Sequence, residues 1–115
     1  YDSIYKKKFI GLASDQSARS GGVRIDFFSK DATFPKGSGV FYSKTNCKIF
    51  VVFSILGSDY KYHLYVKEIF SRMKDEDQVI SDITTQYVNI LQKKIQYNPS
   101  QYFWFHKKWD KTIYK

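Results

Sequence analysis

A histidine and a glutamate separated by four residues, His63 and Glu68, have the residue types of an acid–base pair. A carboxylate beside an imidazole orients the ring, and the ring can then act as a general base. Residues 60–69, however, alternate between apolar and polar side chains, which predicts a β-strand. Side chains five residues apart in a strand point to opposite faces. We therefore expect a surface or strand-end histidine and a solvated glutamate, not a catalytic pair.

Asp15 and Gln16 are better candidates for a ligand site. They follow residues 9–13, a short apolar run that we interpret as a buried strand. Ligand sites of α/β folds lie at the carboxyl ends of such strands. The alternative is that Asp15 only accepts hydrogen bonds from a local loop backbone. Arg24, the third pocket candidate, could meet a phosphate or sugar acid, or could be an exposed strand residue.

The sequence contains no residue pattern typical of a metal site or a nucleotide-binding loop. Cys47 is the only cysteine, and no histidine or second cysteine stands at metal-ligand spacing from it. It cannot form an internal disulfide, which fits a reducing compartment. Gly37-x-Gly39 lacks the third glycine and the Gly-Lys-Ser/Thr ending of phosphate-binding loops. We expect no metal and no cofactor.

The elements that must position these residues alternate between strand and helix. Strands are predicted over 9–13, 23–27, 48–56 and 60–69, and helices over 40–44 and 81–97. We expect 48–56 to be a central strand and 60–69 its antiparallel partner. Ser81 is the expected N-cap of the long helix, residues 71–78 are an expected loop, and a short helix is expected to begin at Pro99. The predicted fold class is α/β, with a partial mixed sheet of about four strands followed by C-terminal helices.

The composition allows one small domain with an anionic partner. The chain has 115 residues, 43% hydrophobic residues and a net charge of +8. Sixteen of its nineteen basic residues are lysines, and twenty-two residues are aromatic. Lysine, isoleucine, tyrosine and phenylalanine are favoured by AT-rich codons, so genome bias competes with a selected nucleic-acid surface as the explanation. Nucleic-acid readers rely more on arginine, so that class is not favoured.

The C-terminal block is the most specific string in the chain. It has the order proline-x-glutamine-aromatic-x-tryptophan-x-histidine-basic-basic-aromatic. Its members are Pro99, Gln101, Tyr102, Trp104, His106, Lys107, Lys108 and Trp109. This block resembles the terminal signature of the bacterial lipid A biosynthesis acyltransferases. It departs from that signature at Ser100, where the family usually has glutamate.

Shorter blocks upstream follow the order of the same family. They are Asp15-Gln16, Gly21-Gly22-Val23, Phe27-Phe28, Ala32-Thr33 and Pro35-x-Gly37. Ser29 stands where the family has a glycine after the two phenylalanines. The resemblance covers about residues 10–109, and the order and spacing of the blocks carry it.

This resemblance implies transfer of a fatty acyl chain from an acyl carrier protein thioester to a lipid A precursor or related glycolipid. The family works at the cytoplasmic face of the inner membrane, and its His–acid pair precedes the Asp-Gln strand. Only fourteen residues precede Asp15 here, and none is a histidine. The chain also starts at Tyr1 rather than methionine. We therefore expect residues 1–115 to be the C-terminal part of a single acyltransferase domain, a fragment without its catalytic half and inactive alone.

The C-terminal signature has alternative roles. His106 could help to place an anionic head group, or could fasten the C-terminal segment by a hydrogen bond. Trp104 and Trp109 are expected to be packing anchors or membrane-interface residues. The basic tail, with Lys107, Lys108, Lys111 and Lys115 against Asp110, could meet an anionic leaflet or be a solvated end. The other function classes that stay open are a small basic nucleic-acid-binding module and a non-catalytic relative that binds anionic lipid.

Overall fold

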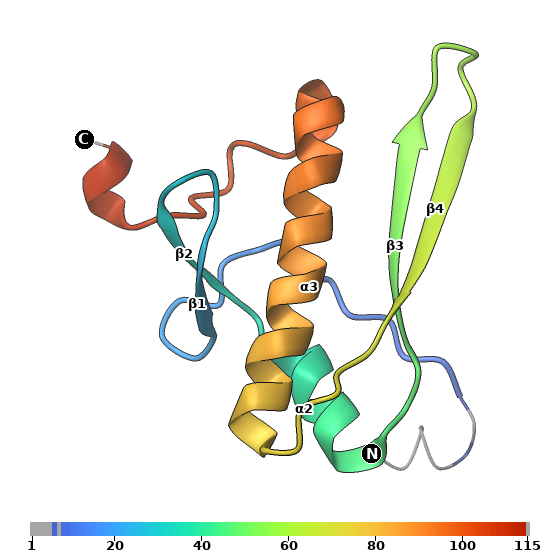
Figure 1. The fold of residues 1–115 in the computed structure, drawn as a ribbon. Coiled ribbons are helices and arrows are strands. Elements are labelled where there is room, and N and C mark those ends of the chain that lie inside the picture. The colour runs from blue at the N-terminus through green and yellow to red at the C-terminus, as the bar shows by residue number, and fades with distance from the viewer. Residues whose placement is uncertain (1–5, 7, 115) are drawn as a thin grey trace.

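The computed structural model describes residues 6 and 8–114. The strands are β1 (Val23–Asp26), β2 (Asp31–Phe34), β3 (Ile49–Leu56) and β4 (Tyr62–Ile69); the helices are α2 (Gly37–Thr45) and α3 (Glu76–Tyr97), followed by the 3₁₀ turns η1 (Pro99–Gln101) and η2 (Lys111–Tyr114). The α/β class is confirmed. The four strands form two separate antiparallel hairpins instead of one mixed sheet. Figure 1 shows α3 running between the two hairpins.

The first hairpin contains a strand that sequence reasoning missed. β1 confirms the strand predicted at 23–27, and it pairs with β2 from Val23 opposite Phe34 to Asp26 opposite Asp31. β2 has only four residues, DATF; they alternate between polar and buried apolar side chains, a signal that sequence reasoning did not use. The turn between the strands places Phe28 and Ser29 at φ 56° and 60°. These left-handed values explain why a glycine would suit position 29.

The second hairpin is longer but lies alone. β3 and β4 pair over eight residues, from Ile49 opposite Ile69 to Leu56 opposite Tyr62. The prediction of an antiparallel partner is confirmed, whereas β3 is not a central strand, because β4 is its only hydrogen-bonded neighbour among the described strands. The alternation of β4 does not correspond to one buried face, since every β4 residue before Ile69 is exposed. No described element packs over its outer face to bury alternate residues.

Residues 9–13 do not form the predicted buried strand. The segment is exposed and belongs to no regular element, and the Phe9 side chain is fully exposed. An apolar run forms a strand only when a neighbouring backbone completes its hydrogen bonds, and no described strand pairs with this one. Ile10 and Leu12 instead line a groove over β3.

The long helix starts earlier than predicted. Its N-cap is Asp75, whose carboxylate accepts a hydrogen bond from the backbone N–H of Gln78 at 3.1 Å. Ser81 therefore lies inside the helix. The stretch 71–78 suggested a loop because it is charged, but acidic residues such as Glu76 stabilise the first turn of a helix. The predicted end at Tyr97 is confirmed.

The core lies on α3 where α2 and the first hairpin meet it. Its fully buried members include Phe27, Phe34, Ile83 and Val88. The helices α2 and α3 approach closely at Gly39, where an added Cβ would lie 2.7 Å from the Ile80 Cα. α2 confirms the short helix predicted at 40–44 and extends it at its N-terminal end. Among the helices of residues 6 and 8–114, none has the length and apolarity to cross a membrane.

Candidate functional site

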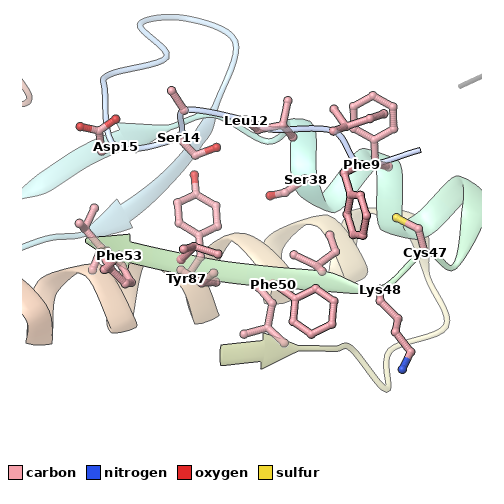
Figure 2. A pocket seen from close by; sticks show the side chains of 18 of the residues that line it. Phe9, Leu12, Ser14, Asp15, Ser38, Cys47, Lys48, Phe50, Phe53 and Tyr87 are labelled. Atoms are coloured by element: carbon pink, nitrogen blue, oxygen red, sulfur yellow. The ribbon is translucent and has the colours of Figure 1, made fainter. Parts of the chain in front are cut away.

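An open groove of about 620 Å³ lies between the 8–15 segment, β3 and the two helices. The segment forms one wall, and β3 crosses the opposite side, as Figure 2 shows. Most of the lining is apolar, with Ile10 and Leu12 from the segment, Val51 and Phe53 from β3, and Leu91 from α3. The volume falls within the roughly 300–1,000 Å³ range of small-molecule sites. The arrangement can bind an extended apolar group.

Polar side chains also line the groove, and one charged member, Lys48, lies near Cys47 and away from Asp15 in Figure 2. Ser14, Asp15, Ser38 and Tyr87 all line the groove, and Figure 2 shows the Tyr87 ring directed toward the segment that carries Ser14. The Tyr87 hydroxyl donates a hydrogen bond to the Pro35 carbonyl at 2.7 Å. Burial raises the pKa of Tyr87, so this hydroxyl stays protonated at neutral pH.

Asp15 is held in place through its backbone by the C-terminal segment. Its carbonyl accepts a hydrogen bond from the Lys108 amino group at 2.9 Å and one from the Tyr102 hydroxyl at 3.4 Å. Burial, with a smaller effect of the Asp15 charge, raises the pKa of Tyr102 to about 12. Of the predicted pocket candidates, only Asp15 lines the groove; Gln16 is exposed beside it.

Lys108 is buried, so the basic residues of the C-terminal segment do not form one continuous exposed tail. Its side chain is only 2% exposed, and its amino nitrogen lies 3.4 Å from the centre of the Phe34 ring. Burial lowers the pKa of Lys108 to about 7, while the charge of Asp15 acts in the opposite direction. Lys107 and Lys111 remain exposed. The local surface charge is therefore smaller than the sequence predicts, because one lysine is part of the interior.

His106 fastens the loop that follows the groove. Its Nε2 atom accepts a hydrogen bond from the backbone N–H of Ser17 at 2.8 Å. Trp109 makes a similar long-range contact, since its indole N–H donates to the Phe27 carbonyl at 3.1 Å. Both residues thus tie the C-terminal segment to the N-terminal third of the chain.

The other signature residues tie the same segment to the second hairpin and to itself. The Gln101 side-chain amide forms two hydrogen bonds with the backbone of Leu56, as acceptor at 2.8 Å and donor at 2.9 Å. The Trp104 indole N–H donates to the Pro99 carbonyl at 2.6 Å. Pro99 opens η1 as its first residue, as predicted, but the helix there is a single 3₁₀ turn.

Arg24 does not reach the groove. It lies on the exposed face of the first hairpin, where its guanidinium is 3.9 Å from the Asp31 carboxylate. Both side chains are more than two-thirds exposed, so this ion pair contributes little to stability. The prediction of Arg24 as a pocket residue finds no geometric support.

His63 and Glu68 have different partners, consistent with the expectation that they do not cooperate. The His63 Nε2 atom lies 3.0 Å and 3.1 Å from the two carboxylate oxygens of Asp59. This contact lowers the pKa of Asp59. Glu68 lies 4.0 Å from the Lys48 amino group. The Asp59–His63 pair is half exposed at the hairpin turn and does not line the groove.

Sequence reasoning did not identify several polar lining residues of the groove, among them Ser14, Ser38 and Tyr87. The Pro35-x-Gly37 block was a usable signal for Ser38, because it marks the start of α2 directly before that residue. Cys47 lines the far part of the groove as a free thiol, close to Phe9 in Figure 2. No cluster of three metal-ligating side chains occurs in the described part of the chain.

Comparisons with known proteins agree with the signature blocks. No curated protein matches the chain at a significant level. A model of the bacterial lipid A biosynthesis acyltransferases matches residues 2–111, nearly the whole chain. The matched range contains the groove, the Asp15 loop and the C-terminal signature that holds it. The chain therefore belongs to the bacterial lipid A biosynthesis acyltransferase family.

Proposed function

We propose that the chain serves the transfer of a fatty acyl group from an acyl carrier protein thioester to a lipid A precursor or related glycolipid. In this proposal the groove along β3 binds the acyl chain. The observation that carries it is the groove itself, a trough of about 620 Å³ whose lining is mostly apolar and includes polar residues such as Ser14, Asp15 and Ser38. The place of action is the cytoplasmic face of the inner membrane.

The physical chemistry of the walls supports an acyl occupant. Each methylene group moved from water to an apolar surface gains about 0.8 kcal/mol. A chain lying along Val51 and Leu91 would gain affinity with length until the groove is filled. An oligonucleotide would find no such complement there, because its backbone is charged throughout.

The chain's own histidines do not supply the general base in this proposal. His63 is bound to Asp59 at the hairpin turn, and His106 accepts a hydrogen bond from Ser17. Neither lines the groove. The His–acid pair of the reaction would then come from a part of the protein outside this chain, and we expect no product from the chain alone with acyl carrier protein thioester and a lipid A precursor.

Cys47 offers a direct test of occupancy. It is the only cysteine and lines the groove, so a bound chain should slow its reaction with a thiol reagent. S-acyl pantetheines of eight, ten and twelve carbons should protect Cys47 with increasing strength. The concentration that gives half-maximal protection should fall roughly 4-fold for each added methylene. Val52→Asp, at an exposed position of β3 that lines the groove, should weaken protection, whereas Tyr60→Asp, an exposed hairpin-turn control, should not.

Other outcomes separate the alternatives. Absence of protection at any chain length would contradict the acyl groove. Tight, salt-sensitive binding of a single-stranded oligonucleotide would favour a nucleic-acid-binding module. Flotation with anionic liposomes without protection of Cys47 would favour a relative that only binds anionic lipid. Acylated product above a no-protein blank would contradict the expected inactivity of the chain.

A further inference from the structure

The hydroxyl of Ser38 is a buried polar group without a hydrogen-bond partner in the described part of the chain. The residue is 9% exposed and lines the groove in the first turn of α2. Figure 2 shows its side chain beneath the 8–15 segment. Leu12 lies against the same turn, with its Cδ1 atom 3.9 Å from the position of a Cβ built on Gly37.

The Ser38 hydroxyl differs from the other hydroxyls of α2, each of which has a hydrogen-bond partner. The other aliphatic hydroxyls bond back to carbonyls of their own helix, Ser43 to Val40 at 3.2 Å and Thr45 to Phe41 at 2.7 Å, and the Tyr42 hydroxyl donates to the Ser71 carbonyl at 3.2 Å. Ser38 stands too early in the helix for such a bond to a helical residue. The carbonyl three residues before it, that of Pro35, accepts the Tyr87 hydroxyl. A buried hydroxyl in this position costs free energy unless another group supplies an acceptor.

The surroundings define which acceptor would suit Ser38. The first turn of a helix carries backbone N–H groups without helical acceptors and a partial positive charge, so it favours an oxygen with partial negative charge. No side chain of the described residues caps this end of α2. The nearby walls, including Leu12 and Val51, are apolar, so a polar atom on an otherwise apolar molecule fits best. An acyl thioester has such an atom in its carbonyl oxygen.

We propose that Ser38 donates a hydrogen bond to the carbonyl oxygen of the acyl group whose chain occupies the groove. This inference rests on the proposed acyl groove and adds a positioning residue to it. The 8–15 segment has no strand partner, so Leu12 can shift to admit the carbonyl. The bond would fix how far the chain enters, and thereby where the thioester carbon stands for attack.

The experiment uses the whole chain, the rate of Cys47 modification and two probes that differ in one carbonyl. S-dodecanoyl pantetheine is a thioester, and S-dodecyl pantetheine is the thioether without the oxygen. The native chain should bind the thioester roughly 3- to 10-fold more tightly, as one neutral hydrogen bond provides. Ser38→Ala should abolish this preference while keeping the affinity for the thioether. Ser38→Thr, which keeps the hydroxyl, should restore it.

Ser43→Ala is the matched control, since it removes a hydroxyl of the same helix that is already bonded to Val40. It should keep the full preference for the thioester. A preference that survives Ser38→Ala would overturn the role of Ser38 and leave the acyl groove standing. Equal binding of both probes by the native chain would also overturn it. Protection by neither probe would contradict the groove, and the inference with it.

Discussion

The buried lysine of the C-terminal signature makes the stability of the fold depend on pH. The pKa of Lys108 is about 7 in the folded chain, and the usual value of about 10.4 applies to the unfolded chain. Between these values the unfolded state binds one proton more, so the free energy of unfolding rises with pH. Below pH 7 both states are protonated and this contribution is flat.

The size of the effect follows from the two pKa values. One group contributes a slope of about 1.4 kcal/mol per pH unit where only the unfolded state is protonated. Between pH 7.5 and 9.5 the gain is about 2 to 3 kcal/mol. The window ends before pH 10, because the raised pKa values of Tyr87 and Tyr102 reverse the trend there. A tyrosine whose folded pKa is raised stabilises the fold below its unfolded pKa and loses that contribution as the pH rises.

Denaturant unfolding followed by tryptophan fluorescence measures this slope directly. The native chain should become more stable from pH 7.5 to 9.5. Lys108→Met keeps an unbranched apolar stem against Phe34 and cannot titrate, so its stability should change little over this range. Lys107→Met, the exposed neighbour, should keep the native slope. A flat native profile, or the same slope in Lys108→Met, would refute the burial of a neutral lysine at this site.

Three other substitutions test local features through the free energy of unfolding. Ser29→Gly should stabilise by about 1 kcal/mol, because it removes a side chain from φ 60°; a loss of stability would contradict that turn geometry. Gly39→Ala should destabilise by about 1–3 kcal/mol through its contact with α3, whereas Gly21→Ala, which meets nothing within 4 Å, should be near neutral. Gln101→Ala should cost about 1–2 kcal/mol and speed amide exchange at Leu56; unchanged exchange would show that its two bonds do not form in solution.

Elements with strong local signals were predictable. The β-branched run of β3, the turn after it and the end of α3 at Tyr97 follow from residue order alone. β2 was missed although its four residues alternate, because so short a pattern was not taken as a strand. The start of α3 was misplaced because acidic residues suit both loops and first helical turns. The strand at 9–13 failed because burial of an apolar run depends on a neighbouring backbone, which a local pattern does not reveal.

The candidate site was predictable only in part. The Asp15 loop was found because polar residues follow an apolar run, and it does line the groove. For Arg24 the structure agrees with the alternative of an exposed strand residue, because an alternating strand does not by itself reveal which face meets the groove. Ser38 escaped notice because a serine after a glycine is ordinary in sequence and acquires meaning only when its hydroxyl is buried without a partner.

The sequence by itself determined the family, because the order of the short blocks from Asp15 to Trp109 can be read without any knowledge of the tertiary contacts. It also determined most helices and strands, because periodicity and capping are local properties. Only the tertiary structure decided the role of Lys108, which the sequence assigns to a basic tail and the fold buries against Phe34 and the Asp15 carbonyl. The reason is physical. The sequence shows only that a lysine is present, whereas the pKa of its amino group depends on the water and the other groups around it in the fold.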